Sequence, residues 1–318
     1  MKVVYERLPS KRIKCIATIG VFDGIHLGHQ FILKKVKEES EEKTLASLAI
    51  TFDILPQQFL YENLTYTGRH PRKCFRGYIT DFEQKKEFIK LIGIDYLWFL
   101  KTNKHLLELS ALDFIDHIFK YFDIKKIIIG EDFRFGYEGK GDVKFLKKLS
   151  KKYNFTVRVL KKKTKNKKVI SSSMIRGLIK EGNLKETRIN LSRNFILKGK
   201  VIKGKGVGSK LGFPTANIAP SHYILPSVGV YSAYVVVGKK KYLAAVNIGS
   251  RPTLVNFGEV LLEVHIIDFK INILGKIVKI FFIDRIRNEH NFKTLDRLKS
   301  AIAQDVNHII SKYSTLPL

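Results

Sequence analysis

The sequence predicts two folded domains, a doubly wound α/β domain followed by a mainly antiparallel β domain that ends in a helix. The first half of the 318 residues alternates short apolar runs with segments of helical period, as parallel strands joined by crossover helices do. From about residue 195 the apolar period becomes two, and over residues 295–312 it returns to 3.6. Because 45% of the side chains are apolar, each domain can bury a core, which excludes disorder throughout.

The first domain is expected to hold parallel strands with helices between them. Strands are predicted at residues 15–19, 45–52, 96–100, 126–129 and 155–160. Helices are predicted at about residues 28–41, 82–92, 111–122 and 142–153. Gly93 follows the second helix as a C-cap and Ser110 precedes the third as an N-cap, so the sequence marks both of these ends.

Two short helices, at residues 173–180 and 184–191, lead into the second domain. Its strands are predicted at about residues 195–203, 230–238, 241–247, 261–268 and 277–283. The last helix presents one apolar stripe, which predicts that it packs on a barrel or sandwich; the stripe holds Leu295, Leu298, Ile302, Val306 and Ile309. We place the boundary near residues 184–193 and divide the chain into domains 1–185 and 186–318.

Positive charge is concentrated in the middle of the chain. The sequence holds 58 Lys and Arg against 29 Asp and Glu, and residues 151–250 alone hold 22 basic and 2 acidic residues. Part of this excess is the run KKKTKNKK, from Lys161 to Lys168. Such a charge either attracts polyanions and phosphorylated small molecules or reflects a lysine bias on solvated faces, and composition does not separate these interpretations.

The cysteines and the apolar segments indicate the compartment. Cys15 and Cys74 are far apart and form no C-x-x-C pattern, so neither a disulfide framework nor a cysteine zinc site is predicted. The first residues lack the apolar stretch of a signal peptide, and no segment offers about 18 uninterrupted apolar residues. We therefore expect a cytoplasmic protein without membrane contact.

The segment IGVFDGIHLGH, residues 19–29, lies between the first predicted strand and the following helix. Gly20, Gly24 and Gly28 allow a ligand to approach the backbone closely, and the helix start presents free N–H groups to an anion. His26 and His29 are three residues apart and so fit one phosphate group. A tight turn with surface histidines, or half of a metal site, explains the same residues equally well when the segment is taken alone.

A second segment, SSSMIR at residues 171–176, strengthens the phosphate interpretation. It follows the lysine run and begins a helix, so its hydroxyls and the Arg176 guanidinium suit the clamping of phosphates. In isolation it is better explained as an ordinary serine N-cap. The position of the first segment favours a ligand, because open α/β sheets bind ligands beyond the carboxyl ends of their strands.

These and further motifs resemble the bacterial bifunctional riboflavin kinase/FAD synthetase family over nearly the whole chain. The match runs through GVFDGIHLGH (20–29), GEDFRFG (130–136) with GKGD (139–142), and SSSMIR (171–176). In the second domain it continues through GKGVGSKLGFPTAN (204–217), GVY (229–231), NIGSRPT (247–253), LEVH (262–265) and RNEHNF (287–292). The resemblance implies a Rossmann-like nucleotidylyltransferase domain with a parallel sheet, and then a β-barrel riboflavin kinase domain with a C-terminal helix.

Two reactions follow from the resemblance. The second domain would phosphorylate riboflavin with ATP to give FMN, and the first would transfer AMP from a second ATP to FMN, giving FAD and pyrophosphate. Riboflavin, FMN, FAD and ATP are then the small-molecule partners. Adenylyl transfer needs no protein nucleophile, because the FMN phosphate attacks the α-phosphorus while the protein orients and stabilises both anions.

The resemblance also assigns site residues. For adenylyl transfer it implies catalytic roles for His26, His29 and Arg176, and binding by Gly20, Phe22, Asp23, Gly24, Gly28, Asp132, Phe133, Ser171 and Ser172. For the kinase it implies Glu263 as the base and Thr215 and Asn217 as ligands of Mg²⁺. It further implies nucleotide binding by Gly204, Gly208, Lys210, Gly212, Pro214, Thr215, Asn217 and Arg287. Without the resemblance, Glu263 would be a solvent-facing strand residue.

The chain departs from the family pattern in three places. The family has TFxPHP after the second strand, and this chain has Ile54 and Leu55 where proline and histidine are expected. A phosphate-proximal imidazole is therefore missing, which predicts an adenylyltransferase that is slower, differently arranged or lost. Ser209 replaces an arginine beside Lys210, and Leu274 stands where tyrosine is common.

Two alternatives follow. The first is a riboflavin kinase whose other domain makes little or no FAD. The second is a nucleic-acid-binding protein, suggested by the basic middle segment. The lysines of residues 161–168 are consecutive and have no interleaved aromatic residues, so a basic loop beside a triphosphate site explains them more simply. The sequence leaves the oligomeric state open.

Overall fold

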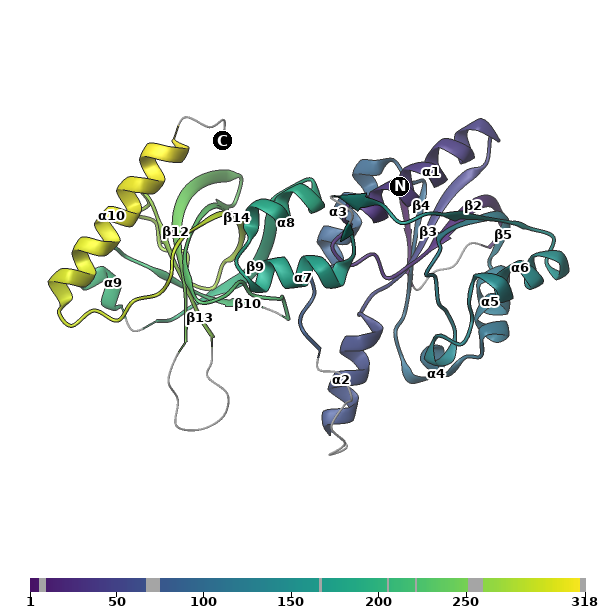
Figure 1. Cartoon of the computed structure of the whole chain (residues 1–318), viewed down its shortest axis with the longest axis horizontal. Coiled ribbons are helices and arrows are strands. Elements are labelled where there is room, and N and C mark those ends of the chain that lie inside the picture. Colours follow the sequence, from purple (N-terminus) through teal and green to yellow (C-terminus); the bar gives the residue numbers. More distant parts are fainter. Residues whose placement is uncertain are drawn as a thin grey trace. The chain divides into compact units, whose positions relative to one another are not determined.

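The computed structural model describes residues 1–5, 10–66, 75–165, 168–204, 206–220, 222–250 and 260–314. The chain forms two compact units, residues 1–174 and 175–318, which are described separately (Figure 1). Cys74, residues 166 and 167 of the lysine run, and Arg251–Thr253 of the predicted NIGSRPT motif lie outside the described residues.

The first unit contains a parallel sheet in the order β1-β4-β3-β2-β5-β6. Its strands are β1 (Lys2–Val4), β2 (Ile13–Ile19), β3 (Ala46–Phe52), β4 (Tyr96–Leu100), β5 (Phe122–Gly130) and β6 (Thr156–Leu160). Its helices are α1 (Leu27–Glu42), α2 (Pro56–Tyr66), α3 (Phe82–Ile92), α4 (Lys104–Glu108), α5 (Ala111–Phe119) and α6 (Val143–Lys152). This confirms the predicted α/β class. A short 3₁₀ turn at Tyr137–Gly139 and the small hairpin of β7 (Thr164–Lys165) and β8 (Lys168–Val169) complete the unit.

Both faces of the sheet are buried, because neighbouring residues of each strand alternate between two cores. Cys15 and Ala17 of β2 belong to the core that includes residues of α5 and α6, whereas Ile16 belongs to the core that includes residues of α1 and α3. Strands covered on both faces form nearly continuous apolar runs, and this property predicted β3 and β4. The reversal of strand order lies between β2 and β5, so their carboxyl ends mark the expected ligand site.

The helix ends follow the local signals in the sequence. Gly93 ends α3 with a φ of 91°, a left-handed conformation that favours glycine, and the Ser110 hydroxyl accepts a hydrogen bond from the Asp113 N–H at the start of α5. Both predicted caps are confirmed. The predictions did not include β1, α2 and α4, which are short or lie outside the strand–helix alternation; α2 begins at Pro56, a favoured first position of a helix.

The second unit is a closed antiparallel barrel in the order β10-β13-β12-β11-β14-β9. Its strands are β9 (Phe195–Ile202), β10 (Ala216–Pro220), β11 (Gly229–Val237), β12 (Lys240–Ser250), β13 (Val260–Ile266) and β14 (Ile277–Arg287). Its helices are α8 (Leu184–Leu191), α9 (Val207–Lys210) and α10 (Leu295–Tyr313). The predictions included every strand of the barrel except β10. Helix α7 (Ser172–Lys180) begins in the first unit and continues into the second.

Two details differ from expectation. Only the later part of α10 packs on the barrel: Val306 and Ile309 are buried against Tyr234 of β11, whereas Leu295 is exposed. The division at residue 174 also precedes the boundary predicted after residue 185, which falls inside α8, because α8 packs on β9 and β14. Within the described ranges, no helix combines the length and the apolar composition that crossing a bilayer requires.

Candidate functional site

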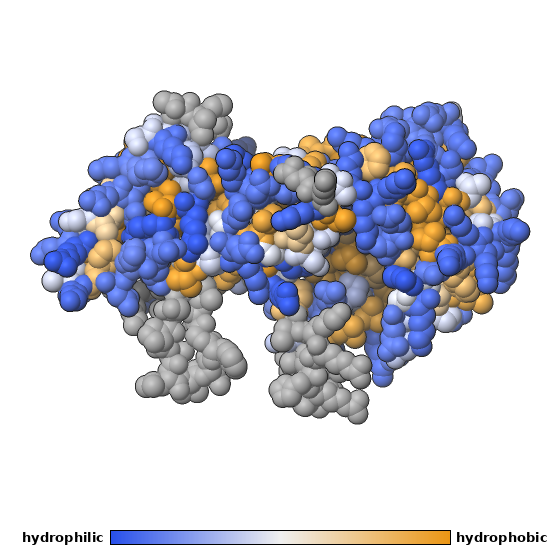
Figure 2. Space-filling model, in the orientation of Figure 1, coloured by the Kyte–Doolittle hydropathy of each residue, from blue (hydrophilic) through white to orange (hydrophobic). Residues whose placement is uncertain are grey.

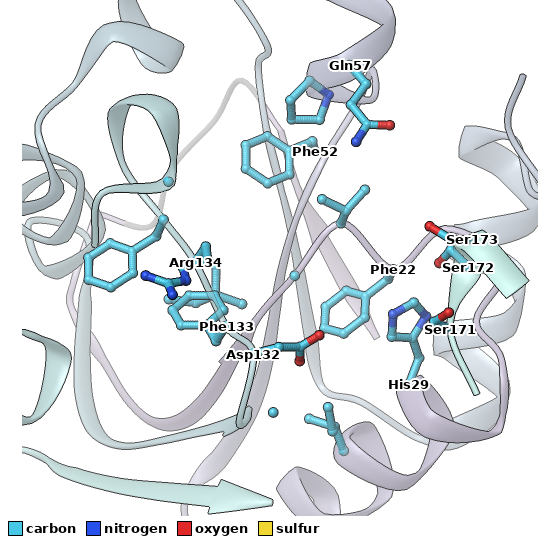
Figure 3. Close-up of a pocket in the computed structure, with 18 of the residues that line it drawn as sticks. Phe22, His29, Phe52, Gln57, Asp132, Phe133, Arg134, Ser171, Ser172 and Ser173 are labelled. Carbon is cyan, nitrogen blue, oxygen red and sulfur yellow. The ribbon is translucent and has the colours of Figure 1, made fainter. Parts of the chain in front are cut away.

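The carboxyl ends of β2 and β5 open into a cavity of about 1800 Å³ in the first unit. One wall is formed by the turn after β2 and by residues 171–173, and the facing wall by residues 130–139 after β5. Figure 3 shows His29 and the three serines on one side and Asp132, Phe133 and Arg134 across from them. The cavity therefore lies where the strand order reverses, as the topology of the sheet predicts.

The two predicted histidines form a stacked pair at the start of α1. Their ring centroids are 3.7 Å apart with an angle of 20° between the planes, and the His26 Nδ1 atom accepts a hydrogen bond of 3.3 Å from the His29 N–H. The Phe22 and His29 rings lie nearly perpendicular, with centroids 5.3 Å apart. Since both histidines line the cavity at a helix N-terminus, the pair is placed to bind an anion.

The turn that carries these histidines has an unusual backbone. Phe22 and Ile25 have φ values of 49° and 38°, in a region that side chains other than glycine rarely adopt. A Cβ atom on Gly20 would lie 3.0 Å from the Phe22 ring, and one on Gly28 would lie 3.1 Å from the His26 ring. Glycine at both positions lets these rings pack against the backbone, and local strain of this kind is frequent at functional sites.

Asp23 and Gly24 stabilise the turn and do not line the cavity. The Asp23 carboxylate is buried and accepts hydrogen bonds from the N–H groups of Ile79 (3.0 Å) and Thr80 (3.1 Å). The Gly24 N–H donates to the Thr80 hydroxyl over 2.9 Å. Both residues thus hold the turn against the segment that precedes α3.

The serine segment connects to the same turn. The Ser172 hydroxyl donates a hydrogen bond of 2.8 Å to the Asp23 carbonyl oxygen, and the Ser171 hydroxyl accepts one of 3.2 Å from the Met174 N–H at the start of α7. Both serines line the cavity. Arg176 follows in α7 within the second unit, and its catalytic role stays a prediction.

The other wall combines aromatic rings with charge. The Phe133 and Phe135 rings are stacked with centroids 5.3 Å apart, and the Asp132 carboxylate pairs with the Lys162 ammonium at 3.2 Å. Lys161, Lys162 and Lys163 all line the cavity, so part of the lysine run lies at a pocket. The remaining lining is largely apolar and includes Phe52, Phe59, Leu60, Leu106 and Leu107. Figure 2 shows hydrophobic residues in a hollow beside α2 and α4.

In the second unit, Asn217, Glu263 and Asn247 form one row across three adjacent strands. Glu263 of β13 lies directly opposite Asn217 of β10 and Asn247 of β12, and directly paired residues share a face of the sheet. The flanking residues Leu262 and Val264 are buried in the other face. The Glu263 carboxylate therefore lies on the face away from the barrel interior, between two amide side chains.

The glycine-rich loop before β10 lies against this row. A Cβ atom on Gly204 would lie 1.8 Å from the Asn217 Nδ2 atom, and one on Gly208 would lie 3.0 Å from the Thr215 Oγ1 atom. Glycine is thus required for the loop to approach both side chains. On the far side of the row, a Cβ atom on Gly249 would lie 2.7 Å from a carboxylate oxygen of Glu289, so a second carboxylate borders this site.

Comparison with known proteins identifies both units. A sequence model of the FAD synthetase family matches residues 8–174, and one of the riboflavin kinase family matches residues 191–312. A protein of Buchnera aphidicola subsp. Acyrthosiphon pisum, named bifunctional riboflavin kinase/FMN adenylyltransferase, is 37% identical over 94% of this chain and 93% of its own length. The chain belongs to the bifunctional riboflavin kinase/FAD synthetase family. The predicted resemblance is confirmed.

Other members of the family match over the same extent. The relative of the same name from Escherichia coli K12 is 31% identical over 92% of this chain and 90% of its own length. The relative from Bacillus subtilis 168 is 32% identical over 98% of this chain and 96% of its own length. A solved structure from Streptococcus pneumoniae, described as a macrolide-efflux protein, superposes with a TM-score of 0.82 at 26% identity and covers 96% of this chain and 97% of its own. The first unit is a FAD synthetase domain and the second a riboflavin kinase domain.

The FAD synthetase cavity collects most of the predicted residues. Its lining contains Gly20, Phe22, His26, Gly28, His29, Asp132, Phe133, Ser171 and Ser172. In the kinase domain, Gly204, Gly208, Thr215, Asn217 and Glu263 lie together, and Pro214 is held by a contact of 2.9 Å between its carbonyl oxygen and the His265 ring. Lys210 ends α9, and Gly212 follows it with a φ of 88°. Their binding roles stay predictions.

The departures Ile54 and Leu55 lie beside the cavity in the chain and outside its lining. Leu55 is 5% exposed and packed into the domain, and neither residue lines the cavity, whereas Phe52, Pro56 and Gln57 do. The turn is fixed by a hydrogen bond of 2.7 Å from the Thr102 hydroxyl to the Ile54 carbonyl oxygen. The first turn of α2 thus supplies Gln57 as a polar lining residue, which the sequence analysis missed. Pro56 was the signal for this helix.

Arg287 has a partner within the kinase domain. Its guanidinium makes hydrogen bonds of 2.8 to 3.1 Å to both carboxylate oxygens of Asp305, which is buried in α10. This bidentate ion pair joins the end of β14 to the closing helix. The predicted nucleotide-binding role of Arg287 is therefore untested, and the contacts favour a structural one.

Asp305→Ala is expected to destabilise the kinase domain by on the order of 3 kcal/mol, because it leaves the Arg287 guanidinium without its buried counter-charge. Urea unfolding measures this loss, and Gln304→Ala, an exposed neighbour on the same helix, serves as the control. Unchanged stability with reduced kinase activity would instead support nucleotide binding by Arg287.

Proposed function

We propose that the cavity of the first unit transfers the adenylyl group of ATP to FMN. The N-terminus of α1, His26 and His29 bind the ATP phosphates, and Ser171 and Ser172 orient them. An oxygen of the FMN phosphate attacks the α-phosphorus, the bond from the α-phosphorus to the bridging oxygen breaks, and pyrophosphate leaves. The two imidazoles stabilise the charge that gathers on the phosphoryl oxygens in the transition state.

The aromatic and apolar half of the cavity suits the flavin. An isoalloxazine is a planar, largely apolar ring system, and Phe133 and Phe135 offer a stacked aromatic surface beside Phe52 and Leu106. Residues 161–163, all lysines, line the same cavity and suit the triphosphate. Binding of ATP therefore explains this part of the lysine run, and nucleic-acid binding is not needed to explain it.

The row on the barrel is proposed to phosphorylate riboflavin. Glu263 accepts the proton of the ribityl hydroxyl as the hydroxyl oxygen attacks the γ-phosphorus, and ADP leaves. Thr215 and Asn217 present hydroxyl and amide oxygens beside the glycine loop, a donor set that fits Mg²⁺ together with nucleotide phosphates. Bound there, Mg²⁺ would neutralise phosphate charge. The Gly204 and Gly208 contacts show that this chain shapes its backbone around these two side chains.

One observation carries the proposal most directly: a stacked histidine pair at a helix N-terminus, serine hydroxyls and an aromatic wall line the same cavity. The test is incubation of the purified chain with riboflavin, ATP and Mg²⁺, followed by separation of the flavins. We expect FMN first and FAD after it. FMN without FAD would support the alternative in which the adenylyltransferase is lost, and unchanged riboflavin would contradict both activities.

The alternative function, nucleic-acid binding, can be distinguished from flavin synthesis with the same purified protein. A protein that binds nucleic acid through its lysines loses affinity steeply as salt rises, whereas the flavin products depend on ATP. The expected cytoplasmic location stays a prediction.

A further inference from the structure

Lys85 is a buried lysine in the first unit that belongs to none of the motifs described above. It lies in α3 with only 2% of its surface exposed. A lysine on a surface helix normally extends its ammonium into water, because burying a charge without a close counter-charge is strongly unfavourable. Its burial therefore needs a physical reason, and its contacts supply one.

The Lys85 ammonium joins two segments of the cavity wall. Its Nζ atom donates a hydrogen bond of 3.0 Å to the Phe52 carbonyl oxygen and lies 3.5 Å from the Thr51 Oγ1 atom. The Thr51 hydroxyl donates in turn to the Val21 carbonyl oxygen over 3.1 Å. Val21 and Phe52 both line the cavity. The ammonium thus connects the end of β3 to the turn after β2 from the protein side of the wall.

Two carboxylates face this ammonium without forming a close pair with it. They are Asp23 in the turn after β2 and Asp53 directly after β3. The Asp23 carboxylate accepts hydrogen bonds from the backbone of residues 79–80, and the Asp53 carboxylate accepts one of 2.8 Å from the Thr102 N–H. Among the described residues, no carboxylate oxygen lies within the 4.0 Å of an ion pair to Nζ. The nearest polar contacts of the ammonium are therefore the Phe52 carbonyl oxygen and the Thr51 hydroxyl, both at the end of β3.

We propose that Lys85 is a positioning residue for adenylyl transfer, whose ammonium fixes the end of β3 and adds one positive charge behind this wall of the cavity, which favours binding of the polyphosphate of ATP. The inference rests on the proposed function of the cavity. Lys85 acts through the Val21 and Phe52 segments and does not itself meet the substrate. In a buried environment its charge is poorly screened, so it contributes to the cavity potential over a short distance.

A pH dependence follows from the same geometry. Burial lowers the pKa of Lys85 from 10.5 to about 8, although the charges of Asp23 and Asp53 oppose this shift. The ammonium is then the main form at neutral pH and is lost as the pH rises through about 8. The unfolded chain holds this proton up to about pH 10.5, so the Lys85 contribution to stability rises between pH 8 and 10.5 while its contribution to adenylyl transfer falls. If Lys85 had only a structural role, the rate of adenylyl transfer would not fall over the pH range in which stability rises.

The test compares Lys85→Met, which removes both the charge and the donor, with Lys85→Gln, which keeps a donor. Lys90→Met, an exposed lysine on the same helix, is the matched control. FAD formation from FMN and ATP is followed from pH 6.5 to 9.5, and riboflavin phosphorylation by the second unit reports on the integrity of each preparation. For both Lys85 variants we expect kcat/KM for ATP to fall about 10-fold to 100-fold, with kinase rates within about twofold of wild type.

The pH profile decides between charge and packing. Above about pH 8, the kcat/KM of the wild-type enzyme is expected to decline relative to that of both variants. The ratio between the kcat/KM values of the two variants should stay constant across the pH range, because neither carries the ammonium. Wild-type kinetics in Lys85→Met, full activity in Lys85→Gln, or a wild-type profile parallel to that of the variants would each overturn the proposal. If neither variant folds, the pH profile of the wild-type enzyme alone tests the proposal. A wild-type kcat/KM that stays constant up to pH 9.5 would then contradict the proposed role of Lys85.

The failure of this inference differs from the failure of the proposed function. If the wild-type chain makes no FAD from FMN and ATP, the function of the cavity is wrong. If it makes FAD and the Lys85 variants make it equally well, only the role of Lys85 is wrong.

Discussion

Glu263→Gln is expected to abolish FMN formation, with a fall in kcat of about 10³-fold, while FAD is still formed from supplied FMN. The substitution keeps the shape of the side chain in its row between Asn217 and Asn247 but removes the group that accepts a proton. General bases contribute about 10²-fold to 10⁴-fold to such reactions. Chromatography of the flavins, with riboflavin and FMN as separate starting substrates, measures both steps in one preparation.

Asp268→Asn is a suitable control for this variant. It makes the same chemical change at an exposed position just beyond the end of β13, and asparagine tolerates the φ of 53° found there. We expect both reactions to continue at the wild-type rate. Loss of FAD formation in Glu263→Gln would argue against separate sites in the two units, and retained FMN formation would remove Glu263 from the role of base.

His29→Ala is expected to have the opposite selectivity, lowering FAD formation by about 10²-fold to 10³-fold and leaving riboflavin phosphorylation intact. The variant removes an imidazole that lines the cavity, stacks on His26 and lies nearly perpendicular to the Phe22 ring. Loss of one group that stabilises charge in a transition state has an effect of about this size. The rate of pyrophosphate release from FMN and ATP gives the measurement.

His105→Ala controls for the loss of a histidine from the same unit. His105 is exposed on α4 and lies outside the cavity lining, although its neighbours Lys104 and Leu106 belong to it. Its FAD formation should match that of wild type. Unchanged FAD output in His29→Ala would exclude His29 from the mechanism and leave phosphate binding to the helix N-terminus and the serines.

Much of the fold could be predicted because its local signals agree with its tertiary structure. Strands β3 and β4 are buried on both faces and form nearly continuous apolar runs, and helices α1, α3 and α5 carry caps or periodicity that the sequence displays. Strand β10 was missed because it is short and ends at Pro220, so its five residues resemble a turn. It pairs with β9 across the glycine-rich loop and with β13, which is distant in sequence, and the pairing with β13 leaves little local trace.

The candidate site was predicted by motif, and the roles of its residues stay predictions. The histidines, serines and Asp132 do line one cavity, as the resemblance implied. Ligand binding by Asp23 stays a prediction, and its buried carboxylate holds the backbone of residues 79–80. A motif records which residue types occur together, and it does not record in which direction each side chain points.

The sequence by itself determined the two-domain plan, the order of the main strands and helices, and the residue types that handle phosphate, since these depend on periodicity and on short contiguous segments. Only the tertiary structure decided that Lys85 is buried behind the cavity, that Arg287 pairs with Asp305, and that Asn247 lies opposite Glu263. These arrangements join residues far apart along the chain. Burial and pairing of charges are properties of the packed fold, because a side chain's desolvation and partners depend on neighbours that no local pattern contains.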